Sequence, residues 1–225
     1  MRVLIAGQKR FGRAVLEVLL RRGCEIAAVS CPDQDDDKLR IGAVNARLPI
    51  LPARLTASMV PDGLDIIIAA HCHSFLSAAT RRRAELGALG FHPSLLPRHR
   101  GRSAVEWAIR MGEPITGGTV YWMNDTVDGG PIAAQDWCHI PPGMSARDLW
   151  RDELMPIGLR LFSEALDLAE NGRIVADPQD TALATWEPAI DGVPPLWRPD
   201  SPMLGSSRFQ VIQREEARSH APRAF

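Results

Sequence analysis

The sequence predicts a doubly wound α/β protein built on a mostly parallel sheet. Short, continuous apolar runs lie at residues 3–6, 25–30 and 64–70, as in strands that are buried on both faces. Between the first two runs, residues 11–22 carry apolar side chains at helical spacing and end at Gly23. Alternation of buried strands with amphipathic helices is typical of a parallel sheet that helices cover.

The same alternation continues as far as His92. Residues 74–86 have the composition of a helix with arginines near its end, where they suit the helix dipole. Residues 88–92 follow as another short strand. A proline-punctuated loop then leads to a helix predicted over residues 103–111, with Ser103 as its N-cap.

Two further strands and a long helix are expected after that loop. Strand-like runs over residues 115–123 and 132–140 flank a glycine-rich connection. Helical spacing over residues 144–171 indicates one long helix, bent at Pro156 and stopped by an Asn-Gly pair.

After the long helix, from residue 175 onward, the sequence has many prolines and little periodicity. Residues 1–174 are therefore interpreted as one domain and residues 175–225 as a proline-rich extension. Its last part, about residues 205–225, is polar and is expected to be disordered. Trp186 and Trp197 lie in the extension, which either packs on the domain or forms a homodimer contact.

The composition of the 225 residues argues against some classes of protein. A net charge of −1 disfavours a broad electrostatic surface for nucleic acid. No apolar run reaches transmembrane length and the apolar start is short for a signal peptide, so a soluble cytoplasmic protein without a membrane partner is expected. The cysteines have no framework spacing and are interpreted as reduced thiols; they are Cys24, Cys31, Cys72 and Cys138.

His92 is the strongest candidate for a catalytic residue. It ends an apolar run, and the following Pro93 disfavours helical geometry and holds it extended. Open α/β sheets bind ligands at the carboxyl ends of their strands, where His92 would lie. An imidazole there stabilises an oxyanion or relays a proton. The alternative is a hydrogen-bonded histidine at an ordinary turn.

Asp128 is the second candidate. Gly129 and Gly130 follow it, let the backbone approach a ligand closely and free the carboxylate to face a cleft. A partly buried aspartate beside a histidine takes a proton directly or through water. Asp-Gly-Gly is also ordinary turn chemistry, so a structural role is the alternative.

Two other clusters are compatible with anion binding. Gly7 and Gly12 bound a short segment with Lys9, where a helix N-terminus could hold a phosphate. A tight turn is the alternative, because the third glycine of a dinucleotide fingerprint is missing. Arg98 and Arg100 lie in the proline-punctuated loop and either anchor a phosphate or carboxylate of a substrate or face solvent.

His71, Cys72 and His73 form a cluster of metal-ligand types. Alternation along a strand end puts the two imidazoles on one face. No third and fourth ligand occurs at the usual spacing, so no metal is expected. These residues are expected to line the end of the sheet near a ligand cleft.

Two segments resemble one known family. The first is Phe-His-Pro-Ser-Leu-Leu-Pro-Arg-His-Arg-Gly at residues 91–101, and the second is Asn-Asp-Thr-Val-Asp-Gly-Gly-Pro-Ile at residues 124–132. Together they resemble the 10-formyltetrahydrofolate-dependent formyltransferases, which include the glycinamide ribonucleotide, methionyl-tRNA and sugar-nucleotide enzymes and a formyltetrahydrofolate hydrolase. The resemblance covers about residues 2–179.

The resemblance implies a formyl transfer from 10-formyltetrahydrofolate, in which an amine attacks the formyl carbon and tetrahydrofolate leaves. It makes His92 and Asp128 the catalytic pair. It implies a folate pocket of backbone groups and apolar contacts, formed by Leu89, Gly90, Trp137, Cys138, His139 and Ile140. The candidates for the acceptor side are Gly7, Lys9, Arg98, Arg100 and Asn124.

Two positions depart from the family pattern. The family's catalytic Asn lies two residues before the histidine, where this chain has Gly90 and no side chain to donate a hydrogen bond. Tyr121 stands where many members have a histidine. Losing one oxyanion donor costs roughly 3–4 kcal/mol where it has been tested. We expect one of two outcomes. Another side chain replaces the missing donor, with Asn124, Tyr121 and His73 as candidates, or the reaction is slow, changed or absent.

Three functions fit these observations. The first is an N-formyltransferase that acts on a small amine, and residues 101–109 resemble the sugar-nucleotide branch, which suggests a nucleotide-linked amino sugar. The second is a formyltetrahydrofolate hydrolase with water as the acceptor. The third is a folate-binding protein whose catalytic site has decayed, which Gly90 supports and the retention of His92 and Asp128 opposes.

Overall fold

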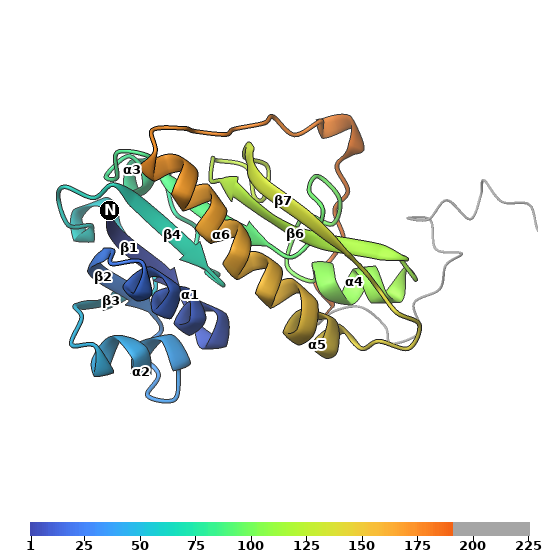
Figure 1. Cartoon of the computed structure of the whole chain (residues 1–225), viewed down its shortest axis with the longest axis horizontal. Helices are drawn as coiled ribbons and strands as arrows, with labels where there is room; N and C mark the ends of the chain where they lie inside the picture. The colour runs from blue at the N-terminus through green and yellow to red at the C-terminus, as the bar shows by residue number, and fades with distance from the viewer. Residues whose placement is uncertain (191–225) are drawn as a thin grey trace, which may run out of the picture. The chain divides into compact units, whose positions relative to one another are not determined.

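A seven-stranded sheet carries the fold of residues 1–190, the part of the chain that the computed structural model describes. The strand order is β3-β2-β1-β4-β5-β6-β7 (Figure 1). Strands β3 to β5 in this order pair in parallel, and β6 and β7 pair antiparallel, so the predicted doubly wound, mostly parallel sheet is confirmed. The strands are β1 (Arg2–Gly7), β2 (Glu25–Cys31), β3 (Ile50–Pro52), β4 (Ile66–Ala70), β5 (Ala88–His92), β6 (Ile115–Trp122) and β7 (Ile132–His139).

Strand β1 shows why the centre of the sheet is apolar along its whole length. Successive side chains of a strand point to opposite faces, so Val3 and Ile5 join one core cluster and Leu4 and Ala6 join another. All four side chains are buried. The cluster on the second face also contains Leu55, Val60, Leu64, Leu76 and Ala84, which come from the connections around β4.

Helices cover the first face of the sheet, where α6 crosses several strands (Figure 1). The predicted helix over residues 11–22 corresponds to α1, but α2 and β3 were not predicted. Helix α2 buries few and mostly small residues, and β3 is too short to show a period. The helices are α1 (Lys9–Arg21), α2 (Lys38–Asn45), α3 (Ala78–Arg81), α4 (Ala104–Arg110), α5 (Ala146–Leu149) and α6 (Met155–Glu170).

The helix predicted over residues 74–86 is wrong, because only α3 is helical there. Beyond α3 the backbone bonds to another segment: Glu85 N–H donates to the carbonyl of Leu64 at the approach to β4. The arginines near the end of residues 74–86 do not all face solvent. Arg81 is buried and its guanidinium lies 2.7 Å from the carboxylate of Asp125, which ties this segment to the loop before Asp128.

The long helix predicted over residues 144–171 is present but interrupted. After α5, residues Trp150–Leu154 form a π-helical turn, and α6 then begins with Pro156 in its first turn. Proline has no N–H to donate to the preceding turn, so the hydrogen-bond ladder changes just before it. The π-helical turn places Trp150 in the wall of the main cavity.

The chain after α6 returns across the sheet and forms part of the same compact unit as the preceding residues. Asp177 bridges to Ile132 at the start of β7, and Trp186 bridges to Arg100. Residues up to Ile190 belong to this compact unit, and the domain boundary expected after residue 174 stays a prediction. Trp197 and the disorder expected for residues 205–225 lie outside the described residues.

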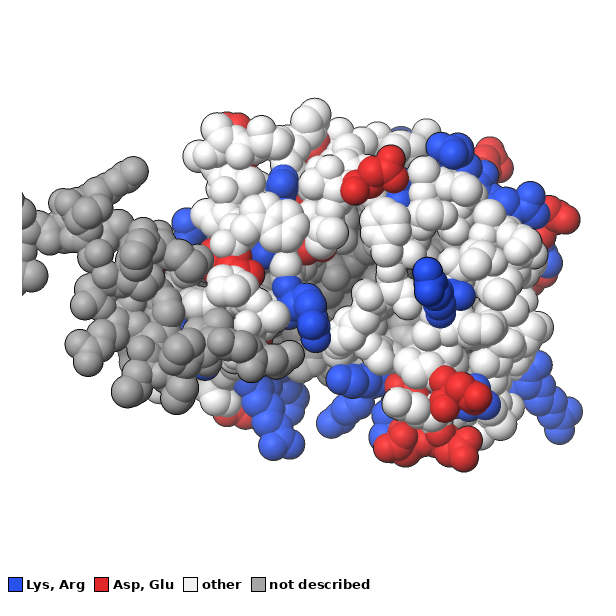
Figure 2. Space-filling model, turned by 180° about the vertical axis from the view of Figure 1, so that it is seen from behind, with Lys and Arg blue, Asp and Glu red and all other residues white. Residues whose placement is uncertain are grey.

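Charges on the face shown in Figure 2 are interspersed in sign, with lysines and arginines beside aspartates and glutamates. Ion pairs at the ends and along the face of α6 include Arg160 with Glu164 and Arg22 with Asp167. In residues 1–190, no helix has the length and apolar character needed to cross a membrane.

Phe162 on α6 provides a test of this packing. Its ring is fully buried against Phe11 and Phe91, so Phe162→Ala is expected to lower the free energy of unfolding by about 3–5 kcal/mol. Urea denaturation would measure the loss. Arg160→Ala on the exposed face of the same helix is the control, and it should cost less than about 1 kcal/mol. Equal losses in the two variants would contradict the described core.

Candidate active site

A cavity of about 1050 Å³ lies beside the ends of β4 and β5. Its walls come from α1, from the chain after β4, from β5 and β6, from the loop between β6 and β7, and from α4 and α5. Ala69, Gly90 and Tyr121 are register partners on adjacent strands, so three neighbouring strands contribute to the cavity wall. Ligand pockets usually measure about 300–1,000 Å³, so this cavity has room for a large ligand.

His92 ends β5 and is buried at the edge of this cavity. Its Nε2 lies 2.7 Å from the carbonyl oxygen of His99. A carbonyl only accepts hydrogen bonds, so Nε2 carries a proton and donates it there. The other ring nitrogen, Nδ1, lies 3.5 Å from Oδ2 of Asp128. The structure thus brings together the two residues that the sequence singled out.

Asp128 is held by two further donors besides its approach to His92. Its Oδ1 accepts a hydrogen bond from the hydroxyl of Tyr121 at 2.8 Å, and its Oδ2 accepts one from the backbone N–H of Gly101 at 2.9 Å. The loop turns back closely on β6, because a Cβ at Gly130 would lie 1.7 Å from the carbonyl oxygen of Trp122. Glycine is therefore required there, and the carboxylate is fixed in direction.

Tyr121 fills the space beside Gly90. A Cβ built on Gly90 would lie 3.2 Å from three atoms of the phenol ring and hydroxyl, which is tighter than ordinary contact. Burial, followed by the charge and hydrogen bond of Asp128, raises the pKa of Tyr121 well above its usual value of about 10. The hydroxyl therefore stays protonated and donates to Asp128 across the ordinary pH range.

Two histidines after β4 line the cavity as neutral rings. Burial, followed by the charges of His73 and Lys9, lowers the pKa of His71 to about 4. Burial, followed by Lys9 and Arg102, also lowers the pKa of His73. The two rings are 5.0 Å apart, and His71 lies edge-on to Trp150. In the part of the chain that is described, no group of three or more His, Cys, Asp or Glu residues is placed to hold a metal ion.

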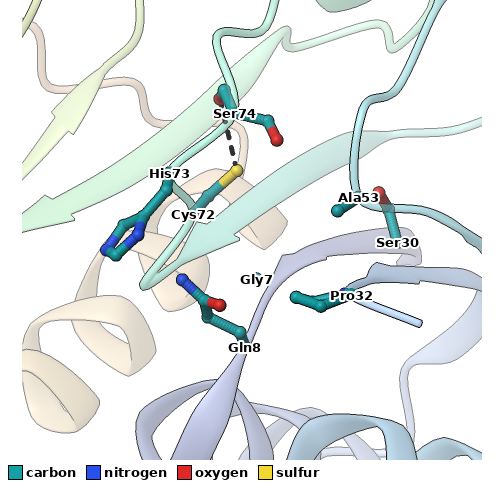
Figure 3. Close-up of a pocket in the computed structure, with 8 residues that line it drawn as sticks. All are labelled: Gly7, Gln8, Ser30, Pro32, Ala53, Cys72, His73 and Ser74. Atoms are coloured by element: carbon teal, nitrogen blue, oxygen red, sulfur yellow. Dashed lines mark hydrogen bonds between the residues drawn. The ribbon is translucent and has the colours of Figure 1, made fainter. Parts of the chain in front are cut away.

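A second pocket of about 110 Å³ lies beside β1 and β2 (Figure 3). Gly7 and Gln8 line one side of it. Cys72, His73 and Ser74 line both this pocket and the main cavity, so the two share a wall. Figure 3 shows the thiol of Cys72 directed at the carbonyl of Ser74, 3.4 Å away. Burial raises the pKa of this thiol, which keeps it protonated.

The N-terminus of α1 has a carboxylate partner within the chain. Asp37 accepts a hydrogen bond from the backbone N–H of Lys9 at 2.7 Å, and its other oxygen caps α2 through the N–H of Arg40. Helix N-termini attract negative charge, and here Asp37 supplies it. An anion bound at residues 7–12 would therefore compete with this carboxylate.

Some of the residues predicted for binding lie at the cavity and others lie elsewhere. Lys9, Gly90 and Asn124 line the cavity, and Gly7 lines the second pocket. The remaining members of the expected folate set do not line it: Leu89, Trp137, Cys138, His139 and Ile140. Leu89 is in the core, and His139 pairs with Ile115 at the opposite end of β6 from Tyr121.

The two loop arginines predicted for the acceptor side have partners within the chain. Arg98 pairs with Glu113. Arg100 is buried, and its guanidinium donates to the side-chain oxygen of Gln179 at 2.6 Å. Neither residue lines the main cavity.

Sequence reasoning missed several apolar residues of the cavity wall, including Phe75, Val105, Val127 and Trp150. Phe75 and Val127 are more than half exposed, and both line the cavity. Their positions just after β4 and just before Asp128 were the available signal. Nothing in the local pattern distinguished Trp150 from a core residue of a helix.

The fold of residues 1–190 is similar to that of solved formyltransferase structures. Residues 50–154 match the family model described as formyl transferase, and the chain therefore contains a formyl transferase domain.

Curated relatives and solved structures agree with this assignment. The chain is 30% identical over 201 residues to the mitochondrial 10-formyltetrahydrofolate dehydrogenase of Mus musculus, covering 83% of this chain but only 22% of that protein. It is 32% identical over 203 residues to a methionyl-tRNA formyltransferase of Lactobacillus delbrueckii, covering 84% of this chain and 64% of the relative. Glycinamide ribonucleotide transformylase 1 from Symbiobacterium toebii superposes with a TM-score of 0.64 at 25% identity, covering 80% and 93% of the two chains.

Tyr121 can be observed directly, because it is the chain's single tyrosine. Its phenol is expected to ionise well above pH 10 in the folded protein and near pH 10 after denaturation. A pKa that is higher in the folded state means that the associated stability is present below pH 10 and is lost as the pH rises above it. Ultraviolet titration of the phenolate measures both values.

Asp128→Asn separates the causes of this shift. The variant removes the charge but leaves the ring buried, so the pKa of Tyr121 should fall only part of the way towards 10. A wild-type phenol that titrates near 10 while the protein is folded would contradict the described contact.

Proposed function

We propose that this chain is an N-formyltransferase that moves the formyl group of 10-formyltetrahydrofolate to a small amine. The observation that carries the proposal is the approach of His92 Nδ1 to Asp128 Oδ2, at 3.5 Å, beside a cavity of about 1050 Å³. Transfer at a formyl carbon needs one group that stabilises charge and another that moves a proton, and this pair supplies both. The formyl transferase domain over residues 50–154, and the donor named in the dehydrogenase relatives, support the choice of donor.

The cavity wall fits a folate. Phe91 and Trp150 have ring centroids 6.3 Å apart, and Phe11 packs against both. His71 adds a neutral ring, because its pKa is about 4. Flat apolar surfaces of this kind suit a planar ligand. When bound, 10-formyltetrahydrofolate supplies the formyl group, and the size of the cavity leaves room for an acceptor beside it.

His92 and Asp128 have different tasks in this proposal. His92 keeps one proton on Nε2 for the carbonyl of His99, so Nδ1 is the nitrogen available to the cavity. In its protonated form Nδ1 donates to the formyl oxygen, where negative charge develops as the amine attacks. Asp128 accepts the proton that the amine loses and returns it to the nitrogen that leaves, so the protons balance.

Tyr121 changes how this site compares with the family pattern. Its hydroxyl is directed at Asp128, so it fixes the proton acceptor and does not replace the missing amide as a donor to the formyl oxygen. His92 therefore has the larger share of stabilising that oxygen. Asn124 lines the cavity, but its side chain also bonds to the backbone of its own loop, at Gly129 and Thr126.

The acceptor is proposed to be a small amine, with nucleotide-linked amino sugars as one group to test. Lys9 lines the cavity from the start of α1 and could meet an anionic part of such an acceptor. The two other functions are separated by their products. Formate release without an amine would identify a hydrolase, and folate binding without turnover would identify a binding protein.

Asp128→Asn tests the assignment of the proton acceptor. It keeps the size of the side chain but removes the carboxylate, so kcat is expected to fall about 10²–10⁴-fold with little change in folate affinity. The assay is tetrahydrofolate release from 10-formyltetrahydrofolate with a mixture of small amines.

Asp125→Asn is the matched control for this prediction. Asp125 lies in the same loop but pairs with Arg81 and does not line the cavity, so the turnover should be retained. If Asp128→Asn kept the wild-type rate, the proposed role of the carboxylate would be wrong.

Gly90→Asn tests whether the site has been rebuilt around Tyr121. The new side chain would press on the phenol ring and disturb its bond to Asp128, so kcat is expected to fall at least about tenfold. The smaller ring in Tyr121→His should make room, and the double variant should recover part of the loss. A large gain of turnover in Gly90→Asn alone would instead show that the site has decayed.

A further inference from the structure

The segment after α6, residues 175–187, here called the strap, lies against both loops of the proposed catalytic pair. It bonds to the loop that carries Asp128 through Gln179, and to the loop after His92 through Thr185 and Glu187. None of these three strap residues lines the cavity. Their effect on a reaction would therefore act through the residues that they hold.

Gln179 holds the backbone of the Asp128 loop. Its side-chain amide donates to the carbonyl oxygens of Asp128 at 2.8 Å and of Gly130 at 2.7 Å. Asp128 has a φ of +51°, a left-handed conformation that residues other than glycine rarely adopt. Such a conformation persists only where its surroundings enforce it, and Gln179 supplies two of the bonds that do so. The amide oxygen is in turn oriented by Arg100.

Thr185 holds the backbone on which His92 depends. The carbonyl that accepts from His92 Nε2 belongs to His99, which is also left-handed, with a φ of +55°. The hydroxyl of Thr185 accepts from the N–H of His99 at 2.8 Å, and its carbonyl accepts from the N–H of Arg100 at 3.0 Å. Thr185 also donates its own N–H to the carbonyl of Pro97. The peptide beneath the imidazole is thus bonded to the strap on both sides.

Glu187 secures the side chain of the same residue. Its carboxylate lies 3.1 Å from Nδ1 of His99, and both side chains are almost fully buried. The other nitrogen of His99 lies 3.5 Å from the carboxylate of Glu113, which also pairs with Arg98. His99 is therefore flanked by carboxylates from two elements.

We infer that two residues of the strap, Gln179 and Thr185, are positioning residues for Asp128 and His92. The inference rests on the proposed function for its catalytic consequence. The two strained turns are the points at which the pair is aimed, and each is fixed by one strap side chain. Small displacements of reacting groups lower rates strongly, so loosening either turn lowers turnover while leaving the cavity wall in place.

Thr185→Val and Thr185→Ser form the first test. Valine has the shape of threonine but cannot accept the hydrogen bond from His99, so kcat is expected to fall about 10- to 100-fold with little change in the KM for folate. Serine keeps the hydroxyl and should recover most of the lost turnover. Gln179→Glu tests the other loop, because a carboxylate cannot donate to the two carbonyls. Asp180→Ala is the control, since it loses a bond within the strap to Ala182 and touches neither loop.

Nuclear magnetic resonance of the His92 ring gives a readout that does not depend on turnover. In the wild type, long-range ¹⁵N–¹H spectra should show the proton on Nε2, as the bond to His99 requires. In Thr185→Val the two tautomers should mix, and in Asp180→Ala the wild-type spectrum should be kept. His92→Gln identifies the resonances, and thermal unfolding verifies that each variant is folded.

The outcomes separate this inference from the proposed function. A wild type without turnover would remove the proposed function, and the His92 spectrum of Thr185→Val would still decide the inference. An unchanged spectrum and an unchanged kcat in Thr185→Val would overturn it, as would a loss in Asp180→Ala as large as that in Gln179→Glu. If Thr185→Val does not fold, Gln179→Glu carries the test: a lower kcat with unchanged KM supports the inference, and wild-type kinetics overturn it.

Discussion

The position of one proton organises this site. His92 donates from Nε2 to the carbonyl of His99, and this bond leaves Nδ1 for Asp128 and the cavity. Because a carbonyl cannot donate, the imidazole cannot exchange the roles of its two nitrogens without losing a buried bond. The loop after β5 must therefore return beneath the ring, and it does so at the cost of a left-handed residue at His99. The strap and the Asp128 loop are arranged around this return.

The neighbourhood of Gly90 shows how a site can change two residues at once. A Cβ at position 90 would lie 3.2 Å from the phenol of Tyr121, so a larger side chain there would require the ring to shift. Compared with the family pattern, Gly90 and Tyr121 provide no amide donor, but they provide a buried hydroxyl that holds Asp128 in place. In the proposed reaction, this exchange gives up a donor to the formyl oxygen, adds a bond to the carboxylate and keeps both His92 and Asp128.

The apolar patterns of the sequence predicted the central strands of the sheet, but they did not predict α2, β3 or the strap. Continuous apolar runs identified β1, β2 and β4 because strands buried on both faces require them, and His92 was found because it ends such a run. The expected folate residues on β7 do not line the cavity, because antiparallel pairing places Trp137 and His139 at the end of β6 away from Tyr121. Strand register cannot be read from the local sequence pattern, and their role in folate binding stays a prediction. The strap was missed because its polar groups bond to loops and so have no period.

The π-helical turn Trp150–Leu154 has a consequence for how the chain can change in length. Such a turn contains one more residue than a turn of α-helix, so removing a single residue there would restore regular winding. Each residue rotates a helix by about 100°. The deletion would therefore turn α5 and Trp150 away from the cavity, while α6 would keep its packing against the sheet. An insertion or deletion at this point would reshape one wall of the cavity and spare the core. A change of one residue in the length of this turn would therefore alter the shape of the cavity.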